Sequence, residues 1–115
     1  MSNRFEQLWD HLNRLRPVSV RKSSTSHVQG QNKYIAEMPG ALVLGSIAEE
    51  KTLNLGNTYT IQGRGSSVER AIEDLFNGTT AGGFYVVLQE GKDPDGTPAS
   101  SRYLWDHDLE EWRSI

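Results

Sequence analysis

The chain has 115 residues, of which 36% are hydrophobic and 23% charged, as expected for one globular domain with its own core. It contains no cysteine, which excludes disulfides, thiol catalysis and metal sites with cysteine ligands. The net charge of -3 identifies no class of partner by itself.

The first predicted element is a helix from about Arg4 to Arg16. Asn3 can cap it, and Glu6, three residues later, completes a capping box. Pro17 ends it, because proline cannot continue a helix. The apolar stripe at helical spacing consists of Phe5, Leu8, Trp9, Leu12 and Leu15.

Short strands are predicted to fill the middle of the chain. The alternation at 18–20 indicates a strand, and the polar stretch 21–33 indicates a mobile loop or a ragged hairpin. Further strands are predicted at 34–37 and, as a buried apolar run, at 41–48, with a turn at Pro39-Gly40 between them. A hairpin follows, with a three-residue loop at 56–58 that sets Leu55 opposite Tyr59 and keeps the apolar residues on one face.

A second helix is predicted from about Ser67 to Asn77. Ser66 and Glu69 match a capping box before it, and Gly78 suits the position just after its end. Its apolar stripe consists of Val68, Ala71, Ile72, Leu75 and Phe76.

The last third of the chain reads as a β-meander. Residues 84–88 resemble a strand that is buried on both faces, and residues 92–98 form a turn-rich loop. A C-terminal hairpin with a four-residue loop at 107–110 would set Trp105 opposite Trp112.

These elements predict a single α+β domain over residues 1–115. The expected fold is one mainly antiparallel sheet of about five to seven strands with two helices packed on one face. The predicted order is α-β-β-β-β-β-α-β-β-β.

A glycine-rich corner is the first candidate site. Gly63-Arg64-Gly65-Ser66-Ser67 lies between a predicted strand and a helix N-terminus, where free N–H groups attract anions. Arg64, Ser66 and Ser67 would then bind a small anion or nucleotide. The plainer interpretation is a strand-to-helix turn with serine caps, since the third glycine of the dinucleotide fingerprint and the lysine of a P-loop are both missing.

The C-terminal hairpin is the candidate that we favour, as a surface for another protein. Aromatic side chains beside charged ones are typical anchors of protein interfaces. The alternative is that the tryptophans pack in the core while the acids solvate a loop. The predicted partner-binding residues are Trp105, Asp106, His107, Asp108, Glu110 and Trp112.

Other kinds of partner have weaker support. Residues 1–33 carry six basic and two acidic side chains, whereas residues 90–115 carry three basic and seven acidic ones. The basic group Arg14, Arg16, Arg21, Lys22 and Lys33 could grip a phosphate backbone, but the acidic domain as a whole does not resemble a nucleic-acid binder.

Catalysis, metal binding and cofactors have no supporting motif. His11, His27 and His107 lie in separate segments, and the loop Asp93-Pro94-Asp95-Gly96 lacks the downstream ligands of a calcium site. We therefore expect no catalytic residue, no metal and no cofactor.

The sequence is best interpreted as a small non-enzymatic protein-interaction domain, of the kind that viruses and mobile elements encode as inhibitors or adaptors. That setting is suggested by size alone. A structural subunit that pairs open sheet edges with copies of itself is a further alternative. No apolar run near the N-terminus is long enough for a signal peptide or a membrane span, so we expect a cytoplasmic protein without a membrane partner.

Overall fold

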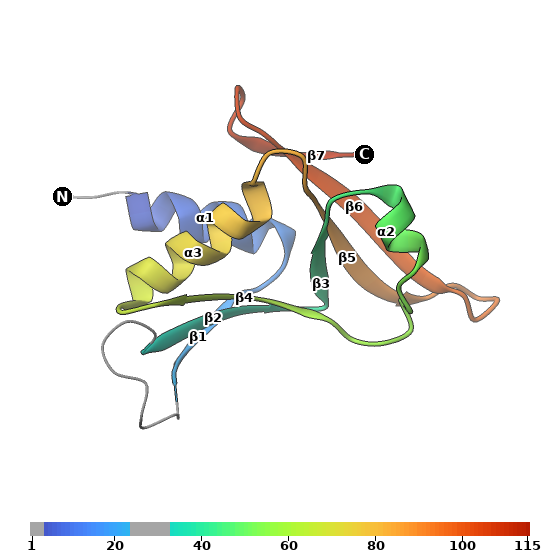
Figure 1. The fold of residues 1–115 in the computed structure, drawn as a ribbon, viewed down its shortest axis with the longest axis horizontal. Coiled ribbons are helices and arrows are strands. Elements are labelled where there is room, and N and C mark those ends of the chain that lie inside the picture. The colour runs from blue at the N-terminus through green and yellow to red at the C-terminus, as the bar shows by residue number, and fades with distance from the viewer. Residues whose placement is uncertain (1–3, 24–32) are drawn as a thin grey trace.

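The computed structural model describes residues 4–23 and 33–115, and these ranges form an α+β fold (Figure 1). Within these ranges it contains three helices and seven strands. In chain order they are α1 (Arg4–Leu15), β1 (Ser19–Lys22), β2 (Tyr34–Pro39), β3 (Ala41–Leu44), α2 (Ile47–Lys51), β4 (Thr60–Gly65), α3 (Val68–Thr80), β5 (Tyr85–Lys92), β6 (Pro98–Asp106) and β7 (Glu111–Ser114).

The strands form two antiparallel sheets, in the orders β1-β2-β4 and β3-β5-β6-β7, so the prediction of a single sheet was wrong. The division falls at Gly40, which lies between β2 and β3 in the left-handed region with φ of 74°. Glycine tolerates this conformation, which lets the chain leave one sheet and enter the next within one residue. Arg16 stabilises the corner by donating from Nη1 to the carbonyl oxygens of Gly40 at 3.3 Å and Gln89 at 2.6 Å.

The predicted element order was also wrong, because the segment after β3 forms a helix. The predicted strand at 41–48 ends at Leu44, and α2 begins after Ser46, whose hydroxyl accepts a hydrogen bond from Glu49 N at 3.1 Å. This Ser-x-x-Glu cap lies within the apolar run and starts a helix in the second half of that run. The predicted hairpin partner at 53–55 is not a strand; Leu53 and Leu55 pack as coil on the four-stranded sheet.

The two long helices were predicted correctly apart from their ends. α1 ends at Leu15, one residue earlier than expected, and Asn3 lies outside the described residues. α3 takes Ser67 as its N-cap instead of Ser66, and continues past Gly78 to Thr80. The predicted loop at 21–33 begins later than expected, because β1 extends to Lys22; residues 24–32 lie outside the described ranges.

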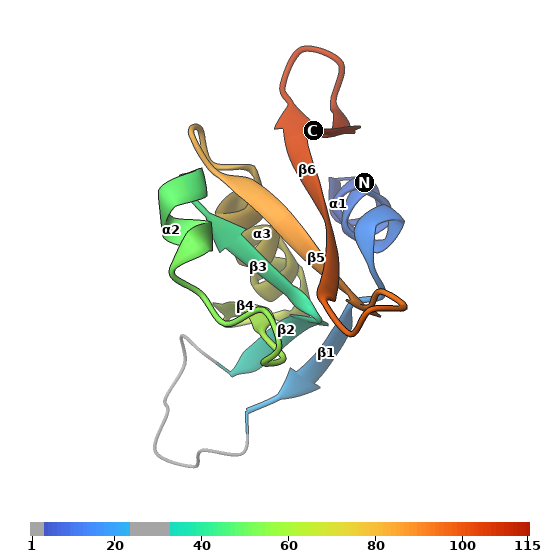
Figure 2. The same ribbon diagram turned by 90° about the vertical axis from the view of Figure 1, so that its right-hand side faces the viewer.

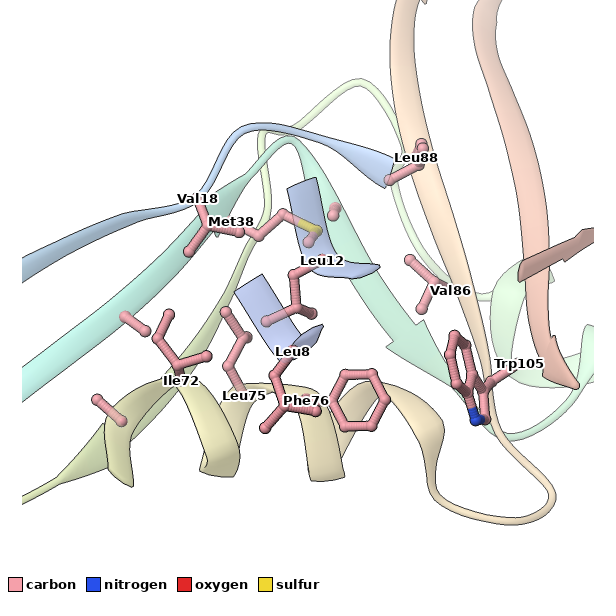
Figure 3. Close-up of a cluster of buried hydrophobic side chains, with 13 residues drawn as sticks. Leu8, Leu12, Val18, Met38, Ile72, Leu75, Phe76, Val86, Leu88 and Trp105 are labelled. Atoms are coloured by element: carbon pink, nitrogen blue, oxygen red, sulfur yellow. The ribbon is translucent and has the colours of Figure 1, made fainter. Parts of the chain in front are cut away.

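The main core lies where α1 and α3 cover one face of the three-stranded sheet and meet the four-stranded one (Figure 1). Leu8 and Leu12 from α1 interlock with Leu75 and Phe76 from α3, and Trp105 from β6 closes the end of this cluster (Figure 3). β5 runs through the centre and buries Tyr85, Val86, Val87 and Leu88 as predicted, but it begins one residue later than expected and leaves Phe84 43% exposed. The predicted loop at 92–98 is shorter than expected, because β5 extends to Lys92 and β6 begins at Pro98.

A buried ion pair attaches α2 to the outer face of the four-stranded sheet. Glu50 is 9% exposed and accepts hydrogen bonds from Arg102, with Nε 2.8 Å from Oε1 and 3.2 Å from Oε2. The Tyr85 hydroxyl lies 3.3 Å from Glu50 Oε1. The Arg102 hydrogen bonds hold the pKa of Glu50 below its ordinary value of 4.5, and burial raises the pKa of Tyr85 above 10.0. The pair therefore stabilises the fold in the ionised form.

Replacing Arg102 with alanine should lower the free energy of unfolding by about 2 kcal/mol at neutral pH. It leaves the Glu50 carboxylate buried without its main partner, and the partial exposure of Arg102 keeps the loss below that of a fully buried pair. Because Glu50 has a lowered pKa in the folded state, this contribution is present above pH 4.5 and is lost as the pH falls through the folded pKa. Urea denaturation at about pH 7 and about pH 3 should show that the stability difference between wild type and Arg102→Ala becomes smaller in acid.

The control is Arg21→Ala, which breaks an exposed ion pair with Glu37 and should lower the free energy of unfolding by less than about 1 kcal/mol. An equal loss of stability in both variants would contradict the prediction.

Candidate interaction surface

The C-terminal hairpin has the register and loop that its sequence predicts. β6 and β7 pair antiparallel, with Trp105 opposite Trp112 and a four-residue loop at 107–110. The two indole rings lie 5.0 Å apart between centroids, in an edge-to-face arrangement at 69°. Figures 1 and 2 show this loop, called the tip below, extending beyond the helices.

The two tryptophans attach the hairpin to the rest of the molecule. Trp105 is 7% exposed and packs edge-on against Phe76 at 5.1 Å and His11 at 4.8 Å. Trp112 is half-buried, and its Nε1 donates to the His11 carbonyl oxygen at 2.8 Å. Both rings are therefore directed at the helices, and they position the hairpin without forming its free surface.

Asp106 shapes the tip. One carboxylate oxygen accepts hydrogen bonds from the backbone N–H groups of Asp108 and Leu109, each at 2.9 Å. The other accepts from Arg113 Nη1 at 3.1 Å. These interactions, the Leu109 N–H foremost, hold the pKa of Asp106 below 3.8. This predicted partner-binding residue thus keeps the loop in a fixed conformation.

The remaining predicted residues, His107, Asp108 and Glu110, are exposed on the tip. Glu110 adopts φ of 51°, a conformation that costs a non-glycine residue free energy and that the hairpin closure requires here. Sequence reasoning missed Leu109, which is 63% exposed at the centre of the tip. The available signal was a single large apolar residue within a run of acids.

A hollow of about 230 Å³ lies between the hairpin and the two long helices. Among its walls are three of the predicted residues, Trp105, His107 and Glu110, which the fold brings together with His11. His11 Nδ1 is buried, and among the described residues it is the one such side-chain atom without a hydrogen-bond partner. The tip thus stands over a partly aromatic cavity.

The glycine-rich corner lies at the end of β4, beside α3. Arg64 and Ser66 line a hollow of about 490 Å³ there, whereas Ser67 caps α3 by accepting from Arg70 N at 3.2 Å. The Arg64 N–H donates to Asp74 Oδ2 at 2.9 Å, so this group already has a partner. The hollow is lined by two basic and two acidic side chains, whose formal charges cancel: Arg64, Arg70, Glu73 and Asp74.

The two glycines of this corner have a packing role. A Cβ on Gly63 would lie 2.3 Å from Leu75 N, and one on Gly65 would lie 2.6 Å from Ala71 N. Both distances are far below van der Waals contact with backbone atoms of α3. Glycine is therefore required at these positions for β4 to lie directly against the helix, whether or not a ligand binds nearby.

Two of the basic residues near the N-terminus are engaged within the fold. Arg16 binds carbonyl oxygens at the Gly40 corner, and Arg21 pairs with Glu37 at 2.7 Å. Their positive charge is thus partly used within the fold.

Neither a metal site in the described residues nor a similar protein identifies an activity for this chain. Within residues 4–23 and 33–115, no three histidine or acidic side chains gather as a metal site would require, and His27 lies outside these ranges. Over the same residues, no helix has the length and apolar character needed to cross a membrane. Comparisons with protein-family models, curated proteins and solved structures find no match to this chain. The geometry of the hairpin therefore carries the functional argument.

Proposed function

We propose that this chain is a protein-interaction domain that binds its partner through the tip and the outer edge of the β6–β7 hairpin. The observation that carries the proposal is the exposure of large apolar side chains along this ribbon: Leu104 is 40% exposed, Leu109 63% and Ile115 60%. Single exposed apolar residues are ordinary, but three of the six large apolar side chains that are exposed in the described residues lie on this hairpin or directly after it.

Charge supports the same surface. Asp108, Glu110 and Glu111 are exposed around Leu109, whereas Arg113 is paired with Asp106. Acidic side chains around an exposed leucine favour a partner with a basic side chain next to an apolar one. Such complementarity raises the rate of association and selects the partner.

Rigidity supports it as well. The Trp105–Trp112 contact fixes the base of the hairpin, and the Asp106 hydrogen bonds fix the tip. A surface already held in one conformation loses little entropy on binding, so more of the contact energy remains as affinity.

Replacing Leu109 with aspartate should weaken partner binding at least about tenfold while leaving the fold intact, because the side chain is exposed and lies in a loop. The measurement is quantitative capture from an extract of the organism that encodes the chain, followed by calorimetry with the purified partner.

The matched control is Ile47→Asp, which introduces the same charge at an equally exposed position (62%) on α2. Ile47→Asp should capture the partner as wild type does. If Leu109→Asp and wild type enrich the same proteins to the same extent, the hairpin is not the binding surface.

A further inference from the structure

We infer that the partner of this hairpin is a second copy of the chain, paired antiparallel with it along β7. This inference rests on the proposed function and names its partner. It follows from the open edge of β7 and from the order of charges along that strand.

β7 is the last strand of its sheet, and within the described residues β6 is its only strand neighbour. Ile115 N donates to the Arg102 carbonyl oxygen at 3.0 Å, which makes residues 102 and 115 a hydrogen-bonded pair. Hydrogen-bonded and non-hydrogen-bonded pairs alternate in an antiparallel ladder, so Glu111 and Arg113 also direct their backbone groups to β6. The N–H and C=O groups of Trp112 and Ser114 therefore face the open edge and can pair with another strand.

Two symmetric registers would pair the edge-facing groups of Trp112 with a residue of β7 in the second copy. In one register, Trp112 lies opposite Ser114 of the second copy, and the two copies of Arg113 face each other. In the other, Trp112 lies opposite its own counterpart, and Glu111 of each copy faces Arg113 of the other. Like charges directly opposite destabilise a sheet and opposite charges stabilise it, so the structure favours the register centred on Trp112.

This register also joins the two molecules through their four-stranded sheets. Each copy supplies Arg113 as the basic group opposite Glu111 of the other. The two four-stranded sheets would join into one continuous sheet across a two-fold axis.

The test is sedimentation equilibrium of the full chain with charge reversals at the two facing positions. Wild type should dimerise. Glu111→Arg places arginine opposite Arg113, and Arg113→Glu places glutamate opposite Glu111, so each variant alone should dimerise at least about tenfold more weakly. An equimolar mixture of the two variants restores opposite charges at both positions, so heterodimers should form. Unfolded variants could not form such heterodimers. Glu73→Arg, an exposed reversal on α3, is the control and should dimerise as wild type does.

A wild type that stays monomeric at all concentrations, a dimer insensitive to the reversals at both positions, or a mixture without heterodimers would each overturn the inference. A monomer that still captures another protein through Leu109 would overturn self-pairing and leave the proposed function standing.

Discussion

Replacing Gly63 with alanine is expected to lower the free energy of unfolding by about 3 kcal/mol, because the new methyl group has no space. It would lie 2.3 Å from Leu75 N and 2.5 Å from the Ala71 carbonyl oxygen, both backbone atoms that cannot rotate aside. β4 is also held in place by its pairing with β2, in which Gly63 lies opposite Ala36. Urea denaturation followed by circular dichroism measures the loss.

Gly78→Ala is the matched control, because a Cβ at Gly78 in α3 would meet nothing within 4 Å. This variant should gain up to about 1 kcal/mol from the better helix propensity of alanine. If Gly63→Ala were as stable as wild type, the glycine would not be serving the contact between β4 and α3. That result would favour the other role of this glycine, which is to let the backbone approach a ligand closely at the corner.

Replacing Trp105 with alanine is expected to cost about 3–4 kcal/mol of stability, the typical loss for a large aromatic residue in a core. The indole is 7% exposed and fills the space beside His11 and Phe76, so its removal leaves a cavity where the hairpin meets the helices. Thermal or urea denaturation should show the loss directly.

The comparison on the same strand is Leu104→Ala. Leu104 is 40% exposed on the opposite face, so this substitution should lower the free energy of unfolding by less than about 1 kcal/mol. A Trp105→Ala variant that kept wild-type stability but lost its partner would mean that the indole contacts the partner. The expected result, loss of stability, would place the indole in the core, as its burial indicates.

The sequence alone determined the elements whose signals are local. The apolar stripes at helical spacing predicted α1 and α3, the unbroken apolar run predicted β5, and the spacing of the two tryptophans predicted their pairing across a four-residue loop. Each of these depends on residues close together along the chain. They could be read from periodicity and turn residues without knowing what lies across the fold.

Only the tertiary structure decided which strands share a sheet and which side chains remain exposed. The end of β3 at Leu44 had a local signal in the Ser46–Glu49 cap, but nothing local showed that Gly40 would send β3 into a different sheet from β2. The hairpin was predicted correctly, but Trp105 faces inward and Leu109 outward because α1 and α3 lie beneath one face of β6 and β7. The physical reason is that a local pattern specifies the period and the ends of an element, whereas its neighbours depend on contacts between residues far apart in the chain.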